Sequence, residues 1–494
     1  MTPAQGVPAR LTRVLIAGLA AGTALFLFIE PGNLYDEPEH LHAAWLMAVG
    51  HQRPIHDFFE HHTPLFWHVL GLFYRAGISG PEVLYFARLL VLACAAGWAV
   101  SLFVLVRRWS PPGPAPAASG FAFSVFILTI LFAQSLVVAR PETLGLLLLG
   151  AALLLWTHPS RSALAAAGCG VAFTLACCAS PRFVLFAPAL LLADADGRPA
   201  LPLPWARLAA GLFAGAATAA VFVVASCPWQ ELLYIMRFSS LLQNVGLTPA
   251  RDLTYLAACA VVTALVPGAL WATSAAPRKP LLAWVAHGAL VWMICFVTAG
   301  KHPNAQAYAP GIFWLGLFAA WLEAQPPLPA AAEVRSSLLA LTVSGALAAC
   351  TILLANASRD YDNAASTTVT RRMLLDKLAP GSRVFMLPLQ HPITIGDASY
   401  WGSILLDDSP GEICAAAELY HARYPAAPIQ LPPCDFIRDL RRAPAAVSRL
   451  IPITAPVEQY AALKAQLEAH YETGDALDYA PARTFAANVL FRKQ

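Results

Sequence analysis

The sequence predicts an α-helical polytopic membrane protein with about eleven transmembrane helices, followed by a small C-terminal α/β soluble domain. Two observations support this fold class. The chain of 494 residues is 58% hydrophobic and only 12% charged, whereas about a quarter of the residues in an ordinary soluble protein are charged. Apolar runs of membrane-spanning length also recur between short breaks rich in Pro, Gly and Arg. The net charge of +3 comes with no basic stripe, so nucleic acid is not an expected partner.

Hydrophobic runs place the expected transmembrane helices before residue 355. The run that follows Arg10 and Arg13 resembles a signal peptide. No convincing small-x-small cleavage site follows it, so we expect an uncleaved first helix over residues 11–29. Further helices are expected over residues 83–106, 120–138, 143–157, 163–179, 183–193, 206–226, 253–273, 281–298, 308–321 and 338–354. The apolar segment 63–74 is too short to cross a bilayer about 30 Å thick, so we expect it to lie at the interface or to re-enter.

The distribution of basic residues orients the chain. Cytoplasmic loops of membrane proteins carry an excess of Lys and Arg, and a cytoplasmic N-terminus places a modest excess of them inside. An anionic ligand or lipid headgroups could account for the basic residues that fall outside, which are Arg53, Arg75, Arg140, Arg182, Arg237, Arg251 and Lys301. We therefore expect a multi-pass membrane protein with its N-terminus in the cytoplasm; in a bacterium this would be the inner (cell) membrane.

The composition changes near residue 356, which divides the chain into two expected domains. Residues 1–355 form the transmembrane catalytic domain, with a first outer loop over residues 30–82, and residues 356–494 form a periplasmic or extracellular α/β domain. Helices are expected over residues 367–378, 415–424 and 456–471, and strands over 383–388 and 485–492. Most of the ten cysteines lie in or beside apolar runs and fit small core residues. Cys414 and Cys434 could pair if this domain is in an oxidising compartment.

The first outer loop holds a dense group of acids and histidines directly after an apolar helix. Asp36 and Glu37 come first, and a carboxylate at this interface could act as a general base between a lipid-linked donor and an aqueous acceptor. The alternative is a pair of solvated acids that end the helix. A second group could supply another acidic position or bind a divalent cation such as Mg or Mn, and it comprises Asp57, Glu60, His61 and His62. The spacing matches no zinc signature, and structural histidines at an interface are the alternative.

Two further outer segments carry candidate phosphate ligands. Arg140 could hold a phosphate while Glu142 faces the same site, although Glu142 also fits an ordinary acid in the first turn of a helix that begins at Pro141. Lys301 could neutralise a phosphate, and Tyr308 follows it; both also fit interface anchors. The sequence contains no phosphate-binding P-loop, dinucleotide fingerprint or serine-hydrolase elbow. A membrane enzyme of this kind would use a donor already in the membrane.

The order of these segments resembles the GT-C membrane glycosyltransferases, and in particular the bacterial branch that includes lipid A aminoarabinose transferases and relatives of protein O-mannosyltransferases. The first outer loop carries the most specific part of the resemblance, in YDEPEHLHAAWLMAVG and DFFEHHTPLFWHVLGLFYRAG. Weaker similarities follow in Ala87-Arg88-Leu89, in ARPETL and in GKHPNAQAY with its Tyr308-Ala309-Pro310. One departure is that His61-His62-Thr63 stands before Pro64, where the aminoarabinose transferases have a Lys.

The resemblance implies an inverting transfer of a sugar from a polyprenyl-phosphate-linked donor to a lipid, glycan or protein acceptor at the outer membrane face. It implies that Asp36 is the base, that Glu37 assists it or binds metal, and that Asp57 or Glu60 is the second acidic position. It also implies that Arg88, Arg140 and Lys301 hold the lipid phosphate. One alternative is a transporter or flippase of a lipid-linked substrate, but the charged residues cluster in loops and not within the membrane helices, which argues against it. Another alternative is a lipid phosphotransferase that acts on the same face. The sugar, the acceptor and the need for a metal stay open.

Overall fold

The structure is a computed structural model. It describes residues 37–54, 62–78, 82–109, 139–193, 205–245 and, with gaps, 268–328, and in the C-terminal part residues 384–387, 419–428, 446–451, 471–473 and 486–492. All or most of the expected helices over residues 11–29, 120–138, 253–273 and 338–354 lie outside these ranges. The expected boundary between the two domains at residue 355 and the possible pair of Cys414 with Cys434 also lie outside them.

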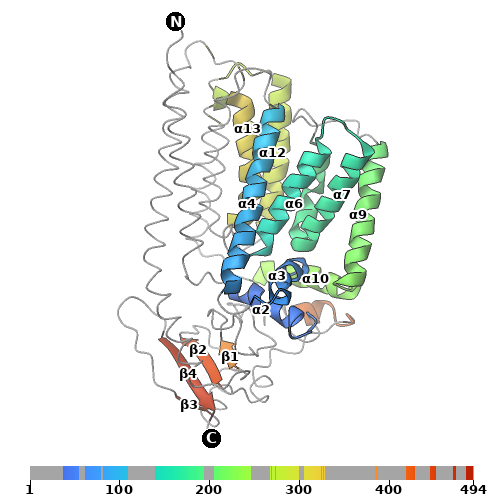
Figure 1. Ribbon diagram of the computed structural model, residues 1–494. Helices are drawn as coiled ribbons and strands as arrows, with labels where there is room; N and C mark the ends of the chain where they lie inside the picture. Colours follow the sequence, from blue (N-terminus) through green and yellow to red (C-terminus); the bar gives the residue numbers. More distant parts are fainter. Residues whose placement is uncertain are drawn as a thin grey trace.

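Long apolar helices run side by side through the described part of the chain (Figure 1). They are α4 (Glu82–Trp109), α6 (Pro141–Trp156), α7 (Ala163–Ala179), α9 (Trp205–Ala225), α12 (Arg278–Ala299) and α13 (Ala305–Glu323). Within the described residues, α4, α9 and α12 are long and apolar enough to cross a membrane, while α6, α7 and α13 are apolar but shorter. The prediction of a multi-pass helical membrane protein is therefore confirmed.

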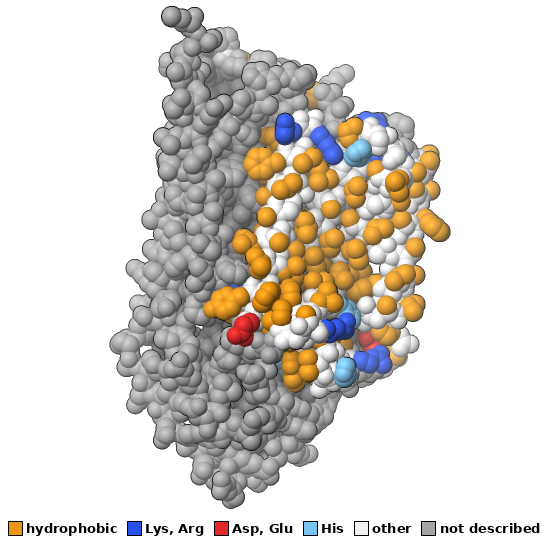
Figure 2. Space-filling view, in the orientation of Figure 1, with side chains coloured by type: hydrophobic (Ala, Val, Ile, Leu, Met, Phe, Trp, Pro, Cys, Tyr) orange, Lys and Arg blue, Asp and Glu red, His pale blue; other side chains and the backbone are white. Residues whose placement is uncertain are grey.

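Figure 2 shows the surface that such a chain requires. Apolar side chains form a broad band over the described helices, and charged and histidine side chains gather at the two ends of that band. Exposed apolar residues of α9 contribute to the apolar surface, among them Phe213 at 79% and Val224 at 88% exposure. A broad apolar surface of this kind is favourable where lipid replaces water.

Small residues allow α7 and α9 to pack closely. A Cβ atom on Gly170 of α7 would collide with the backbone of Gly211 in α9, and one on Gly215 would lie 2.9 Å from Oγ1 of Thr174. Close approach of backbones through small residues is how helices associate inside a bilayer, where lipid tails remove the hydrophobic drive for association.

The expected helix over residues 183–193 is broken. The chain forms a 3₁₀ helix, η2 (Pro181–Phe186), followed by the short helix α8 (Ala187–Leu191). Because α8 ends at once, the carbonyl of Ala189 receives no helical hydrogen bond from within the segment, and Nε2 of His287 in α12 lies 2.8 Å from it. His287 therefore donates the hydrogen bond that this carbonyl needs, because lipid tails offer no donor.

Shorter helices lie across one end of the bundle, called here the α2/α3 end (Figure 1). They are α2 (Glu37–Ala48), α3 (Leu65–Arg75) and α10 (Trp229–Val245). The first outer loop over residues 30–82 is thus partly helical, because α3 buries Phe66, Trp67 and Leu70 in a core shared with α2. Arg108 marks the opposite end, where its Nη1 donates to the carbonyl of Leu154 at 2.9 Å.

The C-terminal part forms a four-stranded sheet in the order β1-β2-β4-β3. The strands are β1 (Val384–Leu387), β2 (Ala446–Ile451), β3 (Tyr471–Thr473) and β4 (Ala486–Arg492). Among the described strands, β1 and β2 pair in parallel and the other pairs are antiparallel. The predicted strands over 383–388 and 485–492 are confirmed, and residues 419–423 are helical within the predicted helix 415–424. The prediction that Tyr471 ends a helix is wrong, because Tyr471 is the first residue of β3. The strand β2 was not predicted.

Candidate active site

The candidate site lies at the α2/α3 end of the bundle. The N-termini of α4, α6 and η2 reach this end, and each places a charged side chain in its first two turns, namely Arg88, Glu142 and Arg182. Segments far apart in the sequence therefore contribute polar groups to the same end of the molecule.

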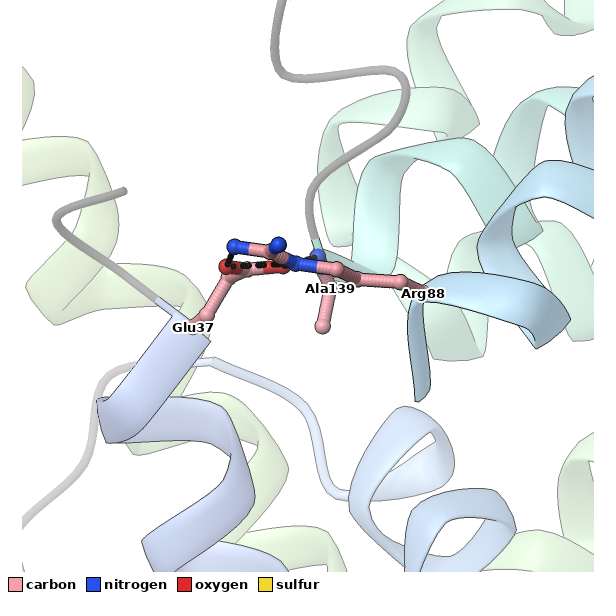
Figure 3. Close-up of polar contacts among 3 residues, drawn as sticks. All are labelled: Glu37, Arg88 and Ala139. Atoms are coloured by element: carbon pink, nitrogen blue, oxygen red, sulfur yellow. Dashed lines mark hydrogen bonds and ion pairs between the residues drawn. The ribbon is translucent and has the colours of Figure 1, made fainter. Parts of the chain in front are cut away.

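The carboxylate of Glu37 in α2 is held from two directions. Nε of Arg88 in α4 donates to Oε1 at 3.0 Å and to Oε2 at 3.1 Å, and Nη2 donates to Oε2 at 2.6 Å. The backbone N–H of Ala139, just before α6, donates to Oε1 at 3.0 Å. Figure 3 shows these three groups meeting between their segments. The two side chains are only 1% and 2% exposed, so this ion pair fastens α2 to α4 and to the start of α6.

This pairing changes what can be expected of Glu37 and Arg88. The sequence resemblance implied that Glu37 assists the base and that Arg88 holds a phosphate. In the structure the two side chains bind each other, and both carboxylate oxygens of Glu37 already accept hydrogen bonds. A direct substrate contact by the carboxylate of Glu37 would first require that this buried pair opens, which is expensive in a medium of low dielectric constant. Arg88 is 1% exposed and so does not present its guanidinium group at the surface.

Glu142 is the centre of a second polar group. Pro141 starts α6, preceded by Arg140 in an extended conformation, and this places Glu142 in the first turn. Nη2 of Arg182 lies 3.2 Å from Oε1 of Glu142, and Nε of Arg140 lies 3.9 Å from Oε2. Glu142 is 3% exposed, whereas the two arginines are 22% and 19% exposed. One buried carboxylate thus lies between two guanidinium groups that reach the surface.

Arg182 belongs to the candidate site but was not among the site residues predicted from the sequence. The signal that could have found it was its position among the basic residues on the expected outer side, directly after Pro181. Its distance from Glu142 in the sequence hid the contact, which forms because α6 and α7 pack together and η2 follows α7.

Two imidazoles complete this group. The rings of His40 in α2 and His62 before α3 lie 4.9 Å apart and nearly perpendicular, and a charge on either ring would act on the carboxylate of Glu142. Oγ1 of Thr63 donates to the carbonyl of Ala179 at 3.0 Å and so fastens the His62 segment to the end of α7. These residues are called here the Glu142 cluster, which comprises Glu142, Arg140, Arg182, His40 and His62.

The Glu142 cluster suits an anion. Two guanidinium groups and one carboxylate leave a net charge of about +1 when the imidazoles are neutral, and a guanidinium has more N–H donors than one carboxylate can accept. Within the described part of the chain, no three His, Cys, Asp or Glu residues are grouped so that they could hold a metal ion. The divalent cation, Mg or Mn, stays a prediction.

The other predicted site residues are not part of this geometry. Asp36, Asp57, Glu60, His61 and Lys301 lie outside the described residues. Asp36 directly precedes the first residue of α2, and Lys301 falls between the end of α12 and the start of α13. Tyr308 is half-buried in α13 and packs on α12, with its ring 6.0 Å from that of Trp292 and 5.6 Å from that of Phe296.

Two further histidines at this end are held neutral. Burial lowers the pKa of His42 in α2 well below its usual value, and the ring of His42 stacks on Trp45 at 5.9 Å. Burial, and secondarily the positive charge of Arg75, lower the pKa of His68 in α3. Both side chains are therefore uncharged near neutral pH.

Comparisons with known proteins place the chain in a known fold. Neither a protein-family model nor a curated protein matches the sequence. The chain is similar in structure to ArnT from Cupriavidus metallidurans bound to undecaprenyl phosphate, with a TM-score of 0.59, 15% identity and 97% of each chain covered. For the apo state of that ArnT the TM-score is 0.58, with 16% identity and 97% of each chain covered. The chain thus has the fold of a GT-C membrane glycosyltransferase, as the sequence resemblance implied.

Proposed function

We propose that this protein is a glycosyltransferase that moves a sugar from a polyprenyl-phosphate-linked donor to an acceptor at the outer face of the bacterial inner membrane. The observation that carries the proposal is the Glu142 cluster, where Arg182 and Arg140 flank one buried carboxylate at the end of an apolar bundle. A lipid phosphate presents its charge at this depth, where the hydrocarbon of the bilayer gives way to water. The acceptor is a lipid, a glycan or a protein.

The chemistry of the transfer fits these groups. Breaking a glycosyl phosphate bond develops positive charge at the sugar and negative charge on the leaving phosphate. Arg182, Arg140 and Lys301 stabilise the phosphate, because fixed cations aimed at a developing charge lower the barrier most. Asp36 takes the proton of the acceptor hydroxyl, and direct attack by that hydroxyl inverts the anomeric carbon. The Glu37–Arg88 pair acts as a support that holds α2, the helix that begins directly after Asp36 in the sequence, against α4.

The fold supports the proposal independently of the cluster. The ArnT structure with which the chain shares its fold was determined with undecaprenyl phosphate bound. The apolar band in Figure 2 offers the prenyl chain of such a lipid a compatible surface beside a polar end.

Transfer and phosphate binding can be measured in lipid nanodiscs. We expect the purified protein to transfer sugar from a polyprenyl-phosphate donor, and Asp36→Asn to abolish transfer while leaving binding of undecaprenyl phosphate intact. We expect Arg182→Gln to weaken that binding by about 10-fold or more, since a hydrogen bond to a charged group contributes about 1.5–3 kcal/mol.

A matched control uses the same charge change at the same end of the molecule. Arg75 at the end of α3 is exposed and lies outside the Glu142 cluster, so Arg75→Gln should leave the affinity unchanged. Normal turnover in Asp36→Asn would remove Asp36 from the mechanism. Equal affinity in wild type, Arg182→Gln and Arg140→Gln would refute the phosphate site.

A further inference from the structure

Residues 419–428, from the C-terminal part of the chain, pack against α10 at the α2/α3 end (Figure 1). Tyr420, Tyr424 and Ala427 of this segment belong to the same buried cluster as Tyr234 of α10. The ring of Tyr420 meets the ring of Tyr234 edge-on, with 4.9 Å between the ring centroids. Tyr420 is only 1% exposed, so the contact buries a large side chain of the segment completely.

Arg237 of α10 fastens this segment by its charge. Its guanidinium carbon, Cζ, lies 4.7 Å from the centre of the Tyr424 ring, which is within the range of a cation–π contact. The same guanidinium group hydrogen bonds to the side chain of Tyr420. Because Tyr420 and Tyr424 are four residues apart, they lie on the same face of the helical turn. Arg237 thus contacts two aromatic side chains of the segment at once.

The hydroxyl of Tyr234 opposes this docking. It is buried, and it hydrogen bonds to no group among the described residues. Burial and, secondarily, the neighbouring Tyr420 raise the pKa of Tyr234, so the segment lies on the hydroxyl side of the ring. A buried hydroxyl without a partner has lost its hydrogen bonds to water. Docking of the segment is therefore less favourable than it would be with a phenylalanine at this position.

We propose that residues 419–428 form a strap that docks reversibly on α10, held by Arg237 and kept releasable by the unsatisfied hydroxyl of Tyr234. The opposing contributions place the docked and released states close in free energy. In the released state water reaches the hydroxyl of Tyr234, whereas in the docked state the aromatic contacts with Arg237 form. The proposal does not depend on the function assigned to the candidate site.

The strap docks beside the Glu142 cluster. The buried cluster beneath the strap also contains Cys178 and, at its edge, Leu65. Cys178 precedes Ala179, whose carbonyl accepts the hydrogen bond from Thr63 that fastens the start of α3 to α7. Release of the strap therefore removes packing next to the candidate site and not at a distant surface.

Hydrogen–deuterium exchange of the whole protein in nanodiscs measures the release. The amides of Tyr424 and Ala427 donate to the carbonyls of Tyr420 and Tyr424, at 2.8 and 3.0 Å. A single helical turn is unstable in isolation, so these amides are protected only while the strap is docked. Peptides of α4 in the same sample report global unfolding. We expect exchange in the strap to be faster than in α4 and slower than in an unstructured peptide.

Two substitutions on α10 should change the exchange rate of the strap in opposite directions. Tyr234→Phe keeps the ring against Tyr420 and removes the unsatisfied hydroxyl, so it should slow exchange by about 10-fold. Arg237→Gln removes the cation that contacts both tyrosines of the strap, so it should accelerate exchange by about 10-fold. A fixed structural contact would not be strengthened by either change.

Matched controls separate these effects from general damage. Arg423→Gln removes an exposed guanidinium group whose carbon lies 6.0 Å from the ring that Arg237 contacts, and it should leave the strap unchanged. Tyr74→Phe removes a buried hydroxyl that donates to the carbonyl of Leu41 at 3.1 Å, and it should not slow exchange in any peptide. Unchanged or faster exchange in Tyr234→Phe, equal rates in Arg237→Gln and Arg423→Gln, or wild-type exchange in the strap that matches α4 or an unstructured peptide would overturn the proposal.

Discussion

At the scale of single residues, the polar side chains of this protein divide into those that are buried and hold the helices and those that stay partly exposed. Glu37 and Arg88 belong to the first kind, because their charges are almost completely shielded from water and satisfied by each other and by Ala139. Arg140 and Arg182 belong to the second kind, since each keeps about a fifth of its side chain exposed while contacting Glu142.

Removing one partner of the Glu37–Arg88 pair should be far more harmful than removing both. Glu37→Gln leaves a guanidinium buried without its counter-charge, and we expect a loss of about 3–5 kcal/mol in the free energy of unfolding. The double variant Glu37→Gln/Arg88→Met should recover much of this loss. Unfolding measured by steric trapping in bicelles would test it.

The control for this experiment is a pair at the same end in which only one partner is buried. Arg53 is 60% exposed and lies 3.0 Å from Glu231, which is 5% exposed. Arg53→Gln should cost less than Glu37→Gln, because water can take the place of an exposed guanidinium group but cannot reach the buried one. If Glu37→Gln were no worse than Arg53→Gln, the buried pair would not be a support.

At the scale of elements, helix contacts inside the bilayer depend on small residues and on satisfied backbone groups. The close approach of α7 and α9 at Gly170 and Gly211 shows the first requirement. The bond from His287 to the end of α8 shows the second.

A methyl group at the α7–α9 crossing should separate the two helices. At Gly170 the added Cβ would meet the backbone of Gly211, which cannot rotate away, so Gly170→Ala should destabilise the protein by about 1–3 kcal/mol. At Gly168 the Cβ would meet the flexible side chain of Leu155 at 3.3 Å, and Gly168→Ala should be nearly neutral. Thermal unfolding in detergent would compare them, and equal losses would contradict the packing argument.

The buried histidines of α2 and α3 should make this end of the protein sensitive to acid. In the unfolded chain a histidine has a pKa of about 6.5, whereas burial lowers the pKa of His42 and of His68 in the folded protein. Below about pH 6.5 the unfolded state therefore binds more protons, and stability is lost as the pH falls, by at most about 1.4 kcal/mol per pH unit for each histidine.

Unfolding measured between pH 7.5 and 5 would check this direction. His42→Phe keeps an aromatic ring beside Trp45 and removes the titrating group, so it should reduce the pH dependence. A stability that rose on acidification, or an unchanged slope in His42→Phe, would contradict the assignment.

At the scale of the whole molecule, charged side chains lie at both ends of an apolar bundle. The α2/α3 end holds the Glu142 cluster, and the opposite end holds Arg108 and Arg207, whose guanidinium group lies 4.6 Å from the ring of Trp156. If the proposed orientation is right, the first end faces the cell exterior and the second faces the cytoplasm.

Cysteine labelling would test this orientation. In a background without native cysteines, Ala76→Cys after α3 and Ser160→Cys between α6 and α7 both introduce exposed thiols. A membrane-impermeant maleimide added to intact spheroplasts should label Ala76→Cys, and should label Ser160→Cys only after permeabilisation. Labelling of both from the same side would show that the two ends do not face opposite compartments.

Much of the fold could be predicted because hydropathy is a local property. The helices near residues 83–106, 163–179 and 206–226 and the strands β1 and β4 were expected within a few residues of their observed bounds. The break at η2 and α8 was not, since the apolar residues there predict a helix while Pro181 and Pro188 interrupt it. For the candidate site, Arg140, Glu142 and His62 were expected, whereas His40 and Arg182 emerged only from their contacts.

The sequence by itself determined that this is a helical membrane protein with acids and bases gathered near helix ends, because composition and hydropathy depend only on neighbours along the chain. Only the tertiary structure decided which of these groups meet. Arg88 and Ala139 lie 51 and 102 positions from Glu37, and no local pattern specifies such partners. The packing of α2 on α4, of α4 on α6 and of α6 on α7 brings such partners together, and so decides which charged side chains are buried in pairs and which keep part of their surface exposed.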